Sequence, residues 1–332
     1  MPFTKPKKNR RMFLMAQEKY SQLIKDGKNT IHDSGIKPTE EFDEELVKQG
    51  CLAFHRHFFS VFVGMLAGLL SLMYVPSIVK VLDNTRQSIT PEKSFLRYLT
   101  TLNHVVQWYK LSANERLLSL KKVRRIHAGV AKSNAMTQYD MVLTQWAFIS
   151  PLFLKTNQMG MDTITIQELD GIRYIFYLVG QALGIQEEYN LCQQDLTSTI
   201  SYMELIFQND IKVLLKTEAK REISQNMAKN VLQGFVMLNP FLHPTAFKHW
   251  TFELFECPLG DDETMKNHIQ LQGYVKNHKL SSTLIKVVFN KILCGKIGLL
   301  MRPLFNLLMK VNIYLANLWQ NHILHPYRRP FL

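Results

Sequence analysis

Residues 123–128 (VRRIHA) place a single histidine, His127, within an apolar helical pattern and beside arginines. Arg124 precedes His127 by three residues, so the two side chains share one face of a helix. An imidazole can bind an iron ion, and a guanidinium can pair with a carboxylate. Heme needs both groups, because it carries one iron ion and two carboxylate propionates. His127 is therefore a candidate heme ligand, although a histidine packed into an apolar core has the same sequence pattern.

A second polar pair precedes this segment, in residues 95–102 (FLRYLTTL). The spacing predicts a helix on which Arg97 and Thr101 share a face. His104 follows one turn later, and we expect it to have a packing or surface role. Taken alone, these arginines are equally typical of surface ion pairs.

Other common site patterns are missing from the sequence. The chain has no HExxH, Walker, GxSxG or GxGxxG motif, which argues against the enzyme classes that use them. His55 and His57 are two residues apart and lie on different helix faces, which argues against a shared metal ion. The cysteines are isolated and form no CxxC pair, which argues against a zinc site or a disulfide framework; they are Cys51, Cys192, Cys257 and Cys294.

The elements that must position these side chains are helices. Helical periodicity dominates the 332 residues, and alternating strand patterns are almost absent. Residues 164–166 are the best strand candidate, but Thr165 followed by Glu168 is more typical of a capping box that begins a helix. We therefore predict an all-α protein with about a dozen helices in a single large helical domain.

Residues 58–79 contain no charged side chain and are long enough to cross a bilayer. Gly64, Gly68 and Ser71 form a stripe of small residues that permits close helix packing in a protein core or in a membrane. Pro76 is expected to kink or end the helix. The residues favour a buried core helix over a membrane span without excluding the span.

The two ends of the chain are basic. The formal net charge is +13, and lysines and arginines crowd residues 5–11. Residues 284–319 mix apolar residues with lysines and one arginine, which is more typical of a basic amphipathic helix on the core or on a membrane surface than of a membrane span. We expect a basic N-terminal extension over residues 1–37 and C-terminal amphipathic helices over residues 266–332. Peripheral membrane contact through these termini is the expected interaction, because no nucleic-acid-binding motif accompanies the charge.

Several segments in a fixed order resemble the latex clearing protein (rubber oxygenase) family, which also includes the ER-bound oxygenase of mycophenolic acid biosynthesis. The matching segments span roughly residues 50–260. They are residues 64–70 (GMLAGLL) with Pro76 and Thr85-Arg86, Arg97-x-x-x-Thr101, residues 123–130 (VRRIHAGV), residues 138–148 (QYDMVLTQWAF), Arg173, residues 179–185 (VGQALGI) and residues 189–192 (YNLC).

The resemblance implies a catalytic domain over residues 38–265 with a globin-like, all-helical core that binds heme b. His127 matches the proximal iron ligand, and Arg97 and Thr101 match a polar pair that members need for activity. Arg124 matches a family arginine, whose charge we expect to pair with a heme propionate. The implied activity is oxygen-dependent oxidation of a hydrophobic, isoprenoid- or lipid-like substrate. The resemblance also implies an intracellular protein, in the cytoplasm or at the endoplasmic-reticulum membrane.

Two positions differ from the family pattern and keep a second function open. Thr100 stands where rubber-cleaving members can carry a lysine, and Ala131 stands where many members carry an arginine. The alternative is a non-catalytic protein on the same fold that binds heme or lipid, or that interacts with a membrane surface.

Overall fold

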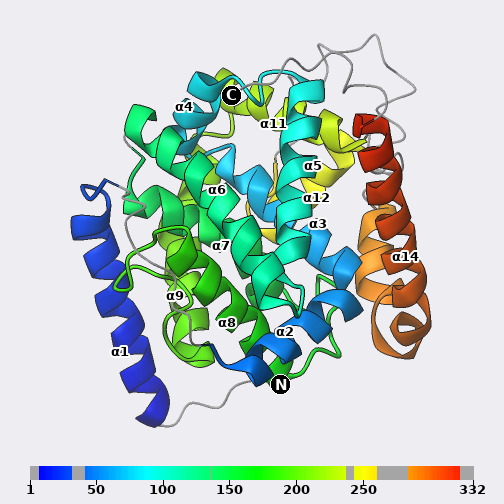
Figure 1. Ribbon diagram of the computed structural model, residues 1–332, viewed down its shortest axis with the longest axis horizontal. Coiled ribbons are helices and arrows are strands. Elements are labelled where there is room, and N and C mark those ends of the chain that lie inside the picture. Colours follow the sequence, from blue (N-terminus) through cyan, green and yellow to red (C-terminus); the bar gives the residue numbers. More distant parts are fainter. Residues whose placement is uncertain (1–6, 32–41, 135, 237–242, 260–282, 322–332) are drawn as a thin grey trace.

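A computed structural model describes residues 7–31, 42–134, 136–236, 243–259 and 283–321 (Figure 1). These residues form α-helices with no β-strand, which confirms the predicted all-α class. The α-helices are α1 (Lys7–Gln22), α2 (Glu44–Arg56), α3 (Phe58–Leu72), α4 (Pro76–Thr85), α5 (Pro91–Trp108), α6 (Ala113–Asn134), α7 (Gln138–Leu154), α8 (Ile166–Ala182), α9 (Leu196–Ile206), α10 (Lys212–Thr217), α11 (Glu222–Val236), α12 (Pro244–Leu254) and α14 (Gly295–Trp319). Short π-helical turns are η1 (Leu23–Gly27), η2 (Phe207–Ile211) and η5 (Val288–Ile292).

Local sequence signals fix where several helices begin. Thr165 and Glu168 form the predicted capping box at the start of α8, in which each side chain bonds to the backbone N–H of the other residue. Thr137 and Asp140 form the same arrangement at the start of α7. Residue 165 is therefore a helix cap and not part of a strand.

Helix α3 lies in the core and crosses α7 at very short range. Twelve of its fifteen residues are buried. A Cβ atom added at Gly68 would lie 1.8 Å from the backbone oxygen of Ala147 on α7, so only glycine permits this crossing. One turn earlier, a Cβ atom at Gly64 would lie 2.5 Å from the Leu152 side chain. The small-residue stripe thus serves helix packing inside the protein.

The charge-free run 58–79 is two helices and not one. Pro76 was expected to kink or end the helix; α3 ends at Leu72, just before it, and Pro76 occupies the first position of α4. α2 and α3 meet at a bend of 90°. The burial of α3 explains its apolar composition without a membrane, in agreement with the favoured interpretation.

Helices α1 and α14 lie at opposite edges of the molecule in Figure 1. α1 packs on α9, and α14 packs on α2, α3, α5 and η5. Among the described helices, α14 is the single one that is long and apolar enough to cross a membrane by length and composition alone. Residues 1–6 and 266–282, which belong to the expected terminal extensions, lie outside the described residues.

Candidate active site on helices α5 and α6

Arg97 and Thr101 lie one turn apart on α5, and both are half-buried. Thr90 caps this helix by accepting a hydrogen bond from the backbone N–H of Lys93, and Pro91 occupies the first turn. The Thr101 hydroxyl donates to the backbone oxygen of Arg97 at 3.1 Å. The Arg97 Nη1 atom donates to the Thr85 hydroxyl at 3.4 Å, which joins α5 to the end of α4. The predicted pair therefore shares one face, as its spacing indicated.

His127 and Arg124 lie on the inward stripe of α6. This stripe includes Leu120 and Ala131, which are 7% and 3% exposed, and the two polar side chains between them are half-buried. The Nδ1 atom of His127 is itself buried. A stripe of this kind, apolar at both ends and polar in the middle, places an imidazole at the edge of the core instead of in bulk water.

The outward face of α6 is exposed to solvent. Arg125 and Gly129 are exposed, and Ile126 is 57% exposed. A Cβ atom added at Gly129 would have no heavy atom within 4 Å. Of the two adjacent arginines, Arg124 is therefore the one on the His127 side, and Arg125 faces solvent.

A hydrogen bond sets the register between α5 and α6. His104 Nδ1 and Ser119 Oγ lie 2.8 Å apart across this helical hairpin. Arg97 lies seven residues before His104 on α5, and His127 lies eight residues after Ser119 on α6. Burial and the nearby Lys122 lower the pKa of His104. His104 thus has a structural role at the contact between α5 and α6.

The donor set around His127 fits heme better than a multi-ligand metal site. The described residues hold no group of three or more His, Cys, Asp or Glu side chains that could bind a metal ion together. Heme iron needs only one or two protein ligands, because the porphyrin supplies the others. One half-buried imidazole, with Arg124 one turn away on the same stripe, satisfies that need and offers a positive charge for a propionate.

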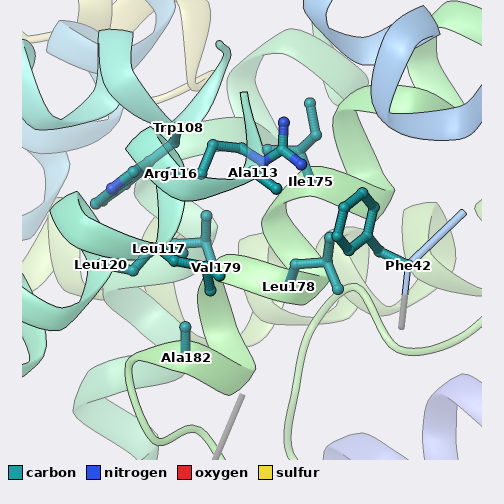
Figure 2. Close-up of a pocket in the computed structure, with 10 residues that line it drawn as sticks. All are labelled: Phe42, Trp108, Ala113, Arg116, Leu117, Leu120, Ile175, Leu178, Val179 and Ala182. Atoms are coloured by element: carbon teal, nitrogen blue, oxygen red, sulfur yellow. The ribbon is translucent and has the colours of Figure 1, made fainter. Parts of the chain in front are cut away.

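An apolar cavity lies further along the inward stripe of α6, between this helix, the end of α5 and α8 (Figure 2). Its volume of about 50 Å³ is far below the several hundred Å³ of a cofactor pocket, so it does not hold heme in this conformation. Leu120, on its wall, precedes His127 by two turns. The lining residues are Phe42, Trp108, Ala113, Arg116, Leu117, Leu120, Ile175, Leu178, Val179 and Ala182.

Arg116 is the one charged side chain among the lining residues, and no pattern in the sequence pointed to it. It is 7% exposed, its guanidinium donates to the backbone oxygens of Lys110 and Leu111, and it lies 5.1 Å from the ring centroid of Phe42. The residues that line the cavity come from separate segments of the chain, so no local sequence pattern predicts the cavity. Its apolar character suits a hydrophobic molecule.

The sequence matches the family described as ER-bound oxygenase mpaB/B'/Rubber oxygenase, catalytic domain, over residues 52–247. The chain belongs to this family. The matched segment covers more than half of the chain and includes both polar pairs, Arg97 with Thr101 and Arg124 with His127. It also lies within the predicted catalytic domain, residues 38–265. Membership supports an oxygenase in general and relates the chain to an ER-bound member.

Comparison with curated proteins and with solved structures gives no match. The globin-like arrangement of the core therefore stays a prediction, as do the domain boundaries. The all-helical architecture and the membership of the mpaB/rubber oxygenase family do not depend on it.

Proposed function

We propose that this protein is a heme-b-dependent oxygenase that uses molecular oxygen to oxidise a hydrophobic, isoprenoid- or lipid-like substrate. The observation that carries the proposal is the placement of His127 and Arg124 on the inward stripe of α6, inside the segment that matches an oxygenase family. Bound heme would supply the oxygen chemistry at its iron. The protein would supply the ligand, the charges and the apolar surroundings.

His127 would hold the iron through its imidazole, and Arg124 would pair with a propionate. Because the pair would be half-buried, solvent would screen it less than an exposed pair.

Arg97 and Thr101 would form the polar part of the reaction site. Arg97 has five N–H donors, and the structure assigns one of them to Thr85. Thr101 donates its hydroxyl proton to its own helix, so its oxygen remains an acceptor. This pair can therefore orient a polar oxygen atom near the substrate while the surrounding apolar side chains exclude water.

The test is the ultraviolet–visible spectrum of the purified full chain beside two variants. We expect a strong heme band in the wild type that His127→Ala shifts or removes and that added imidazole restores. Arg125→Ala, on the exposed face of the same helix, is the matched control and should leave the spectrum unchanged. A wild type without heme after addition of hemin, or a His127→Ala variant with unchanged heme content and iron ligation, would overturn the assignment.

A non-catalytic heme- or lipid-binding role is the second candidate. Thr100 is exposed, and its hydroxyl donates to the backbone oxygen of Leu96. Ala131 is 3% exposed, so the arginine of other family members has no counterpart on this stripe. Oxygen-dependent turnover of an added terpenoid that disappears in Arg97→Ala would exclude this candidate. Heme binding without any turnover would favour it.

A further inference from the structure

Helix α14 places two polar side chains, Arg302 and Asn306, on the face that contacts the protein. Arg302 is 4% exposed, and its guanidinium donates to Asp162 Oδ1 at 2.6 Å, to the Thr163 hydroxyl and to the backbone oxygen of Leu293. One turn later, Asn306 is 9% exposed. The helix is therefore attached to the protein by polar contacts as well as by packing.

The Asn306 side chain forms hydrogen bonds with backbone groups at the bend between α2 and α3. Its Oδ1 atom accepts from the backbone N–H of Phe59 at 2.9 Å, and its Nδ2 atom donates to the backbone oxygens of His55 and Arg56. Near the end of α14, Asn317 and Asn103 exchange two side-chain hydrogen bonds of 2.7 and 3.1 Å. These contacts fix which face of α14 points inward.

The outward face of α14 is apolar. Eleven of the 23 exposed large hydrophobic side chains of the described chain belong to this helix. Leu300 is 80% exposed, Tyr314 62%, Ile297 60% and Leu307 58%. A soluble surface helix has the reverse arrangement, with apolar residues inward and polar residues outward. An apolar face of this extent marks a contact surface with another apolar phase or partner.

The segment that carries this face has no acidic side chain of its own. Residues 283–321 contain no Asp or Glu, and Lys291, Lys296 and Lys310 are exposed. A symmetric dimer through α14 would bring two sets of lysines together without a carboxylate on either helix, which is unfavourable. Anionic phospholipid headgroups above an acyl layer match both the lysines and the apolar face.

We propose that α14 lies in the plane of a membrane that contains anionic phospholipids, with its outward face in the acyl layer and its inward face on the protein. α14 does not cross the bilayer in this arrangement, because Arg302 and Asn306 keep it attached along α2 and α3. Membrane contact was expected through both basic termini, but α1 lies at the opposite edge of the molecule (Figure 1), and the proposal concerns α14 alone. It does not depend on heme binding.

Trp319 provides a direct reporter of this contact. It lies at the end of α14 and is 38% exposed, whereas the other three tryptophans are at most 4% exposed; these are Trp108, Trp146 and Trp250. Phospholipids brominated on their acyl chains quench only nearby indoles. We expect vesicles of brominated phosphatidylcholine and phosphatidylserine to quench part of the fluorescence of the full chain, and Trp319→Phe to remove that part.

Vesicle flotation tests the face itself. Leu300→Glu with Leu307→Glu should lower the partition coefficient onto phosphatidylcholine–phosphatidylserine vesicles at least tenfold, because both leucines would lose their apolar contact. Phe13→Glu with Leu14→Glu is the matched control, since these α1 residues are 45% and 48% exposed at the opposite edge. The control should stay within twofold of the wild type.

Four results would overturn the proposal. The first is a wild type that does not float with anionic vesicles, and the second is binding that only the α1 variant abolishes. The third is a dimer in solution that Leu300→Glu with Leu307→Glu dissociates, when neither the wild type nor this variant binds vesicles. Quenching in the wild type that Trp319→Phe leaves unchanged would also contradict it, and this readout does not depend on whether the glutamate variants fold.

Discussion

Replacing Arg302 tests how firmly α14 is attached to the protein. The Arg302 and Asp162 side chains are 5% and 27% exposed, so Arg302→Met leaves a carboxylate that water reaches only in part. Removing one partner of a buried ion pair costs about 3–5 kcal/mol. Partial exposure of Asp162, and the hydrogen bond it keeps from the backbone N–H of Gly295 at 2.8 Å, reduce this cost. We therefore expect the free energy of unfolding to fall by about 2–4 kcal/mol.

Urea denaturation measures the global effect, and hydrogen exchange of the α14 amides shows whether the helix detaches before the rest unfolds. Lys296→Met is the matched control, because Lys296 is an exposed cation on the same helix; its effect should stay within about 0.5 kcal/mol. A double-mutant cycle with Asp162→Asn should give a coupling free energy of about 1–3 kcal/mol. A loss below about 1 kcal/mol with unchanged α14 exchange would refute the reasoning that this ion pair holds the helix.

Three further predictions concern the core and the reaction site. Burial and two nearby guanidinium groups lower the pKa of His57 from 6.5 to about 3, so only the unfolded chain gains a proton there as the pH falls below 6.5. The free energy of unfolding should therefore drop by up to about 1.4 kcal/mol per pH unit between pH 6.5 and 3. His57→Gln should remove that pH dependence in urea titrations. Gly68→Ala should lower the free energy of unfolding by about 3 kcal/mol, because the added Cβ atom meets the Ala147 backbone. Gly129→Ala, the control, should be neutral or stabilising. Equal effects of the two variants on the urea midpoint would contradict the close crossing of α3 and α7. Arg97→Ala should lower oxygen-dependent turnover about 100-fold while the heme content measured by its spectrum stays at the wild-type level.

Local patterns predicted the helices well because the signals that begin and end them are short. The Thr165–Glu168 box begins α8 through contacts within one turn, as predicted, and the break expected at Pro76 lies between the end of α3 and the start of α4. The face shared by Arg97 and Thr101 follows from helix geometry alone. The glycine stripe predicted a close approach, and its partner, Ala147, became known only once the structure brought α3 and α7 together.

The orientation of α14 could not be predicted, because its sequence is compatible with either face pointing inward. What decides it is the position of acceptors elsewhere: Asp162 for Arg302, and the backbone at the α2–α3 bend for Asn306. The apolar cavity beside α6 was missed for the same reason, since Phe42, α6 and α8 meet only in the folded chain. Contacts between distant segments carry no signature in a single sequence.

Helix α14, for which we propose membrane contact, packs against α5, the helix that carries the predicted site residue Arg97. Asn317 on α14 bonds to Asn103 on α5, and the Trp319 ring packs edge-on against Phe95 of α5 at 5.6 Å between centroids. Arg97 lies on the same helix, within two turns of both α5 contacts. A hydrophobic substrate is concentrated in a bilayer and scarce in water, so an enzyme that acts on it gains from keeping its reaction site close to the lipid. In the proposed arrangement, the attachment of α14 to α5 would keep the predicted reaction site close to the lipid. Variants at the Asn103–Asn317 pair should weaken this attachment without changing the outward face of α14.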